Sequence, residues 1–204
     1  APGAKLAYAA LLAAALARIA LAGQDPVGLS WLGGPGLPLV SRGFGTGTFE
    51  RLVGTLESAA AAGDLAGDPE TVGRAVRLVG RRAGRGSALL IFSDLLDLPE
   101  ESRRAMAVLG SGRRALVVVQ VLDPRERDLS FRGKVRLRAM EGGNVVVTDA
   151  DAVRKAYLQR LDAHVTEWRR ALEGEGGRLV VACTTDDPVS VVRKLLQAIA
   201  EVRR

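Results

Sequence analysis

The stretch Ser87 to Asp97, with the sequence SALLIFSDLLD, constrains the fold more than any other part of this chain. Its apolar run is unbroken until Ser93 and Asp94, and so uniform a run is typical of a strand buried on both faces of a parallel sheet. In open α/β sheets, ligands bind just beyond the carboxyl ends of such strands. Asp94 is therefore a candidate binding residue. Asp97 is explained more simply as a helix-capping or loop carboxylate, because Leu98-Pro99 soon begins a helix.

Strand and helix patterns alternate along the chain and predict an α/β fold with a doubly wound, mostly parallel Rossmann-like sheet in one domain, residues 1–204. Residues 27–32 and 37–40 flank a Gly-rich turn, which predicts a hairpin that adds an antiparallel edge to this sheet. Residues 125–147 are expected to be irregular and charged, with a short strand at 145–147. The other expected strands are residues 87–93, 115–122 and 179–183, and the expected helices are residues 4–22, 48–62, 69–83, 98–109, 150–173 and 188–202.

Composition limits the possible functions. A single cysteine, Cys183, excludes an internal disulfide framework and favours a reducing, cytoplasmic location. One cysteine and one histidine also make a zinc site improbable. The net charge of +6 is compatible with an acidic partner, but only four of the 29 basic residues are lysines and the arginines are scattered in pairs. Nucleic-acid binding is therefore not expected.

The segment Lys5 to Ala22 has two interpretations. A basic residue, an Ala/Leu run and small residues at its end are similar to a signal peptide. Arg18 interrupts the run, however, and the apolar stretch is short for a membrane span. A helix that is apolar nearly all round is explained more simply as a buried helix under a sheet. We therefore expect no membrane span in this chain.

Three further features could carry chemistry. The run Gly43 to Thr48 is similar to a phosphate loop but lacks the required lysine, so it is interpreted as a flexible loop. His164 is interpreted as a surface or groove histidine, and Cys183 as a small packed thiol. Asp94 and Asp123 both follow expected strands, and two such carboxylates together with hydroxyls would select Mg²⁺ or Mn²⁺ over zinc.

Several segments, taken in order, resemble the von Willebrand factor A-like domain of the bacterial domain-of-unknown-function 58 family. The resemblance covers nearly the whole chain. The segments that carry it are Lys5 to Leu16, Asp25 to Leu29, Ile91 to Asp97, Val119 to Glu126, Asp149 to Tyr157 and Leu179 to Pro188.

The resemblance implies a metal-ion-dependent adhesion site that binds Mg²⁺ (or Mn²⁺). Asp94 matches the aspartate after the fourth strand of that family, and Thr71 best matches its threonine, with Thr46 or Thr48 as alternatives. The family's Asp-x-Ser-x-Ser element and the first, central strand have no match here, and by resemblance they would lie just before Ala1. Their absence would leave a slot between residues 27–32 and 87–93. Mg²⁺ is thus expected only in a form that carries this element.

By resemblance, the expected function is a non-enzymatic protein–protein interaction domain that acts with a MoxR-type AAA+ ATPase in a chaperone-like assembly. One alternative is a Mg²⁺-dependent phosphoryl hydrolase on a Rossmann-like sheet, using Asp94 and Asp123. The other is nucleic-acid binding by the Arg-rich segment Arg125 to Arg138.

Overall fold

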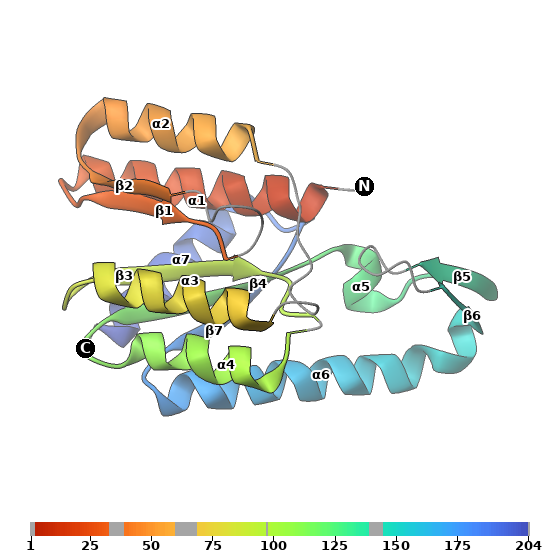
Figure 1. Ribbon diagram of the computed structural model, residues 1–204. Coiled ribbons are helices and arrows are strands. Elements are labelled where there is room, and N and C mark those ends of the chain that lie inside the picture. The colour runs from red at the N-terminus through yellow and green to blue at the C-terminus, as the bar shows by residue number, and fades with distance from the viewer. Residues whose placement is uncertain (1–2, 33–38, 60–68, 97, 139–144, 204) are drawn as a thin grey trace.

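A parallel three-stranded sheet lies at the centre of the computed structural model, which describes residues 3–32, 39–59, 69–96, 98–138 and 145–203 (Figure 1). The strand order is β3-β4-β7, and Val118 of β4 lies between Ile91 and Leu179 of its neighbours. All eight residues of β4 are buried, because both its edges are paired and both its faces are covered. These strands, β3 (Ala88–Ser93), β4 (Ala115–Leu122) and β7 (Arg178–Cys183), confirm the three parallel strands predicted from the sequence.

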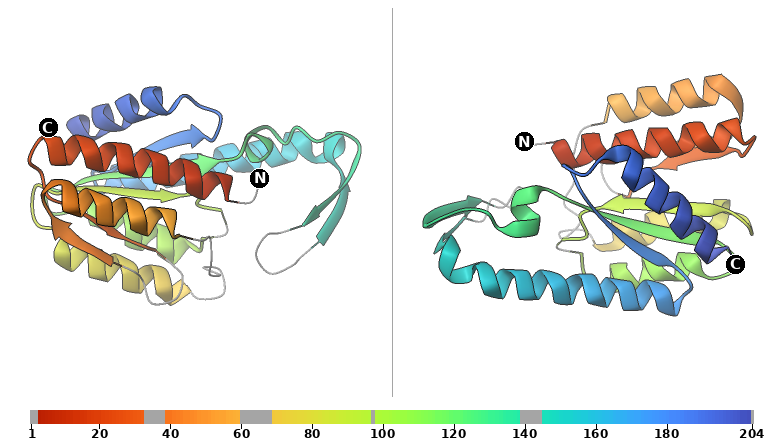
Figure 2. Two further views of the ribbon diagram at one scale, coloured as in Figure 1. Left: turned by 90° about the horizontal axis from the view of Figure 1, so that it is seen from above. Right: turned by 180° about the vertical axis from the view of Figure 1, so that it is seen from behind.

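Helices cover both faces of this sheet, as Figure 2 shows from two sides. Side chains alternate along a strand, so Leu116 and Val118 of β4 point to one layer, and Val117, Val119 and Val121 point to the other. The first layer holds α3 (Pro69–Arg82), α4 (Glu100–Ala107) with the short 3-10 helix η1 (Val108–Gly110), and α6 (Ala150–Gly174). The second layer holds α1 (Ala4–Ala22) and α7 (Pro188–Val202).

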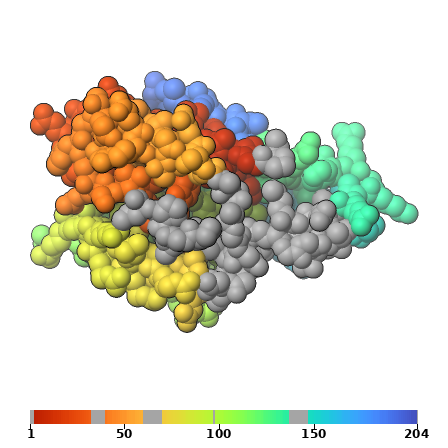
Figure 3. All heavy atoms as spheres, turned by 45° about the horizontal axis from the view of Figure 1, so that its top comes forward, coloured from red at the N-terminus to blue at the C-terminus, as the bar shows by residue number. Residues whose placement is uncertain are grey.

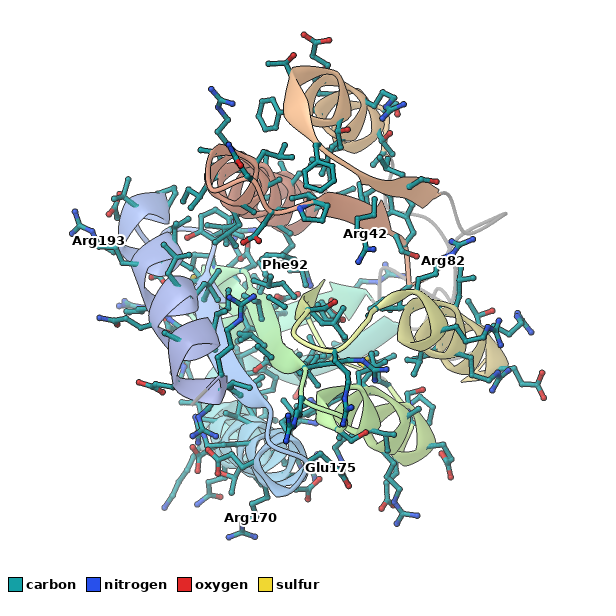
Figure 4. The ribbon with its side chains drawn as sticks, turned by 90° about the vertical axis from the view of Figure 1, so that its left-hand side faces the viewer. Arg42, Arg82, Phe92, Arg170, Glu175 and Arg193 are labelled. Carbon is teal, nitrogen blue, oxygen red and sulfur yellow. The ribbon has the colours of Figure 1, made fainter. Side chains whose placement is uncertain are left out.

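The view in Figure 4 shows how polar and apolar side chains divide between these layers. Phe92 of β3 lies between the sheet and the second helix layer, where it packs against the buried cluster of α1 and α7. Arg170, Glu175 and Arg193 point outward from the helices. The molecule therefore has the mixed α/β architecture predicted from the sequence.

The amino-terminal hairpin departs from the prediction. Strands β1 (Val27–Ser30) and β2 (Leu39–Gly43) pair with each other in antiparallel fashion and form a sheet of their own, not an edge of the main sheet. The hairpin packs instead against α1 and α2 (Gly45–Glu57). Within the described chain no strand pairing joins it to β3.

The prediction of a flexible loop over Gly43 to Thr48 is wrong, because Gly43 ends β2 and Gly45 to Thr48 form the first turn of α2. Gly43 is required here: a Cβ at this position would lie 2.6 Å from the Thr48 hydroxyl. Gly45 begins the helix with a φ of +74°, which glycine adopts readily. The Thr48 hydroxyl donates a hydrogen bond to the carbonyl of Phe44, 2.9 Å away. The glycines thus form a strand-to-helix turn.

The prediction for residues 125–147 is partly wrong, because residues 125–138 contain regular structure, whereas the short strand predicted at 145–147 is confirmed as part of β6 (Val145–Asp149). A short helix, α5 (Pro124–Asp128), follows β4, and β5 (Lys134–Arg138) pairs with β6 in a second antiparallel hairpin. The alternating cations of β5 look like a solvated loop in the sequence. In β5 only Val135 and Leu137 lie between these cations, so the apolar strand signal is weak there.

Helix α1 has the length and apolar composition to cross a membrane, and it is the one such helix in the described ranges. Core helices of water-soluble folds pass the same test. Here Tyr8, Leu12 and Leu16 of α1 are buried against the sheet and α7. This packing agrees with the interpretation of residues 4–22 as a core helix.

Candidate interaction site at the carboxyl edge of the sheet

Strands β3, β4 and β7 end at the same edge of the sheet, and an acidic residue follows each of them. Asp94 comes directly after β3, Asp123 directly after β4, and Asp186 three residues after β7. Parallel strands place their carboxyl ends together, which is where open α/β folds bind their ligands. The edge predicted from the sequence is therefore present, and its acidic side chains have identifiable partners.

The ammonium of Lys5 bridges two of these strand ends. It donates to Asp94 Oδ2 at 2.7 Å and to Glu126 Oε1 at 2.6 Å. The three side chains are 27%, 36% and 29% exposed respectively, so the cluster is partly screened from water without being enclosed. Charge-assisted hydrogen bonds of this length are about twice as strong as neutral ones. Lys5 thus fastens the first turn of α1 to β3 and α5.

The ionised form of Lys5 is favoured. Burial by itself lowers the pKa of Lys5, but the hydrogen bonds to Asp94 and Glu126 outweigh it, and the pKa is raised above its usual range. Glu126 is held in turn by the backbone, because its second oxygen accepts from the amide of Asp123 at 2.9 Å. Asp123 accepts from the amide of Arg125, which completes a capping box at the start of α5.

Asp94 is oriented from the buried side of the sheet. Gln120 of β4 is fully buried, and its side-chain amide donates to the Asp94 carbonyl at 2.9 Å. The Gln120 carbonyl oxygen has no hydrogen-bond partner in the described part of the chain. Leu95, which follows Asp94, is buried with a φ of +60°. Such a conformation costs a β-carbon-bearing residue energy.

The role of Thr71 as the metal-site threonine stays a prediction. Thr71 lies in the first turn of α3, and its hydroxyl accepts a hydrogen bond from Arg74 one turn later, at 2.6 Å. The side-chain contacts of Asp94 are with Lys5 and the Leu96 amide. The two alternative candidates for the metal-site threonine lie at the start of α2, where Thr46 is exposed and Thr48 is buried with its hydroxyl bonded to the Phe44 carbonyl. Asp97 lies outside the described residues.

The cluster does not fit a divalent cation. A hard cation such as Mg²⁺ takes about six oxygen ligands, and the described residues contain no group of three His, Cys, Asp or Glu side chains that could hold a metal. The oxygens of Asp94 and Glu126 that face each other are already joined by the Lys5 ammonium. Asp94 is one ligand of the set that the family resemblance implies, and the described residues do not supply the rest.

The groups that could act as nucleophile or base are engaged elsewhere. His164 Nε2 lies 3.0 Å from the Leu95 carbonyl and its ring packs edge-on against Trp168, so it is a groove histidine, as predicted. Cys183 is buried and accepts from the Thr185 hydroxyl, which confirms a packed thiol. The Ser93 hydroxyl accepts from the Leu95 amide. None of these contacts pairs a nucleophile with a base.

The end of β7 contributes a third anchor. The Tyr8 hydroxyl of α1 donates to the Asp186 carbonyl at 2.9 Å. Burial raises the pKa of Tyr8, and the neighbouring negative charges of Asp186 and Asp187 add to the increase. Asp187 caps α7 as predicted, by accepting from the amide and the hydroxyl of Ser190. Helix α1 is therefore attached at the ends of all three parallel strands.

Asp187 should make the fold sensitive to acid. The hydrogen bonds from Ser190 lower its pKa, so its stabilising effect is present above the unfolded-state pKa, near 4, and is lost as pH falls through the lower folded-state value. Asp187→Asn retains a capping side chain but cannot titrate. We expect the thermal midpoint of this variant, followed by circular dichroism, to fall less than that of the wild type between pH 7 and pH 2.5. Asp162→Asn, on an exposed part of α6, is the control; an unchanged acid response in Asp187→Asn would contradict the prediction.

Lys5, Glu126 and Gln120 were missed by sequence reasoning. For Glu126 a signal was available: Asp123-Pro124-Arg125-Glu126 has the spacing of a capping box. No local pattern marks Lys5, whose partners lie 89 and 121 residues away. Gln120 was predicted only as part of the strand 115–122, although a single amide within an eight-residue apolar strand is itself a signal of a specific polar contact.

Residues 2–167 match the family described as protein of unknown function DUF58. No curated protein matches the chain. Two solved structures are similar over nearly all of it. One is the conserved hypothetical protein BatB from Bacteroides thetaiotaomicron, 18% identical with a TM-score of 0.55, covering 97% of this chain and 87% of that one.

The other is an aerotolerance-related membrane protein from Bacteroides fragilis that carries multiple mutations to serines, 20% identical with a TM-score of 0.56, covering 96% and 88%. At these identities the similarity shows the fold alone. Because α1 has the length and apolar composition to cross a membrane, the cytoplasmic location stays a prediction, with membrane association as the alternative.

Proposed function

The chain belongs to the family of proteins of unknown function DUF58, and we propose that it is a non-enzymatic protein-interaction domain that binds its partner at the carboxyl edge of the β3-β4-β7 sheet. The observation that carries the proposal is Asp94 at this edge: Lys5 binds its partly exposed carboxylate, and Gln120 holds its backbone carbonyl. A carboxylate held in one conformation loses little entropy on binding, and this favours recognition.

The proposal is non-enzymatic because the polar side chains at this edge act as structural links. Asp123, which the hydrolase alternative requires as a partner of Asp94, is occupied as the cap of α5. Phosphoryl transfer needs several charged groups that converge on one reacting point. In the described chain the cation nearest to Asp94 is Lys5, and it is already bound by two carboxylates.

Three finer features remain proposals that rest on the family resemblance. The fold is proposed to be von Willebrand factor A-like, and the partner a MoxR-type AAA+ ATPase in a chaperone-like assembly. A Mg²⁺ bridge is proposed only for a form of the protein that carries an Asp-x-Ser-x-Ser element. In such a form Asp94 would be one ligand, and the metal would supply a positive charge to a partner's carboxylate.

Replacing Asp94 with asparagine should weaken ATPase binding at least tenfold, because the amide keeps the shape of the side chain and removes its charge. The measurement is biolayer interferometry with a purified MoxR-type ATPase from the same genome, repeated with Mg²⁺ and with EDTA. Asp162→Asn makes the same chemical change on exposed α6 and should bind as the wild type does.

Two results would count against this proposal. Equal ATPase binding by Asp94→Asn and wild type would remove Asp94 from the interface. Hydrolysis of a phosphate ester that depends on Mg²⁺ and is lost in Asp94→Asn would favour the hydrolase alternative.

A further inference from the structure

The β5-β6 hairpin projects from the body of the molecule beside α5. The ribbon views show it beyond the sheet and its helices, and in the space-filling view it stands out at one end of the surface (Figure 3). It makes no strand pairing with the other two sheets in the part of the chain that the structure describes. We call β5 and β6 together the ribbon. The ribbon adds no residue to either hydrophobic cluster of the described core, so the stability of the fold does not explain its presence.

The base of the ribbon is firmly attached. Arg154 of α6 donates to the carbonyls of Leu129 and Phe131, and it pairs with Asp151 at 2.7 Å. The second oxygen of Asp151 accepts from the amide of Gly133 at 2.8 Å, directly before β5. These bonds orient the ribbon at its root, so it is presented to solvent in a defined direction.

One face of the ribbon is basic. Lys134 and Arg136 are two residues apart on β5, so they share a face and lie roughly 6.5 Å apart. Both are exposed, and neither forms an ion pair with a described residue. Arg132, also exposed, precedes them. Other cations nearby are neutralised: Arg127 pairs with Asp128, and Arg154 with Asp151.

The same face carries an exposed apolar side chain. Val147 of β6 pairs directly with Arg136, and it is 72% exposed. Asp149 pairs with Lys134, but its carboxylate is engaged as the cap of α6. Cations that surround an uncovered valine complement a ligand with both carboxylates and apolar groups. A phosphate backbone offers nothing apolar to Val147.

We propose that this face of the ribbon binds an extended acidic segment of a protein partner, with carboxylates at alternate positions and an apolar residue against Val147. Alternate residues of an extended peptide repeat at the same spacing as Lys134 and Arg136. Both ribbon strands also leave one edge unpaired among the described residues, where such a segment can add main-chain hydrogen bonds. This inference rests on the proposed protein-interaction function and adds the chemistry of the partner.

The test is fluorescence anisotropy at low salt with a labelled 12-residue peptide that carries glutamates and valines at every second position, with serines between them, so that both kinds of side chain share one face of the extended chain. Binding should weaken at least tenfold in the double variant Lys134→Glu/Arg136→Glu and severalfold in Val147→Ser. The control, Arg169→Glu/Arg170→Glu, makes the same change of charge at exposed positions of α6 and should retain binding. All substituted side chains are exposed, so circular dichroism should show unchanged folding.

Three results would overturn the inference: no binding of the peptide by the wild type, equal loss in the control variant, or tighter binding of a DNA duplex or of phosphatidylglycerol vesicles. Asp94→Asn should bind the peptide normally. Weaker ATPase binding by Asp94→Asn with normal peptide binding would support the carboxyl-edge site alone. Weaker peptide binding by Lys134→Glu/Arg136→Glu with normal ATPase binding would support the peptide site alone, so the two proposals can be distinguished.

Discussion

Leu12→Ala should lower the free energy of unfolding by about 2–5 kcal/mol, the range for a leucine removed from a packed core. Leu12 is fully buried in the cluster that joins α1 to β4 and α7. The neighbouring residue on the same helix, Leu11, is 52% exposed, and Leu11→Ala should change stability by less than about 1 kcal/mol because little apolar area is lost. Urea denaturation followed by circular dichroism measures both.

This pair of variants also tests the role of α1. A helix that packs on the sheet has one sensitive face, whereas a helix that inserts in a bilayer is exposed to lipid over most of its surface. A large difference between Leu12→Ala and Leu11→Ala therefore supports the core helix. Similar small effects of both substitutions would contradict this packing and favour the membrane-associated alternative.

Lys5→Met should lower the free energy of unfolding by about 2 kcal/mol, between the values for an exposed ion pair and for a buried one. Methionine keeps the apolar stem of the side chain and removes its charge. Asp94 and Glu126 then lose their shared cation and repel each other across the strand ends. Lys155→Met is the matched control, because Lys155 is exposed on α6 and forms no ion pair with a described residue. Equal stability of the two variants would show that the bridge contributes nothing.

The effect of Lys5 should depend on pH in one direction. Its pKa is raised in the folded protein above the ordinary value of 10.5. A raised pKa means that the stabilisation is fully present below the unfolded-state value and is lost as pH rises through the folded-state value. The stability difference between wild type and Lys5→Met should therefore be constant from pH 7 to about pH 10 and shrink only at higher pH. A difference that disappears near neutral pH would contradict the bridge.

The carboxyl-edge site was only partly predictable. Asp94 was identified because a polar residue after an apolar strand is a local signal, readable within ten residues. Lys5 and Glu126 were not, because their contacts with each other and with Asp94 depend on where α1 and α5 lie on the sheet. Thr71 was assigned by resemblance alone, and its role as a metal ligand stays a prediction.

The sequence by itself determined the three parallel strands, the helices that alternate with them and the core of the fold, because buried strands and capped helices leave local periodic patterns. It did not determine β5, whose stripe of cations obscures the apolar pattern of a strand, or the pairing of β5 with β6. It also did not determine that the amino-terminal hairpin stands apart from the main sheet, since strand pairing depends on which edge another segment leaves free. Only the tertiary structure decided these strand pairings and placed the Lys5 ammonium against Asp94, because both depend on contacts between residues far apart in the chain.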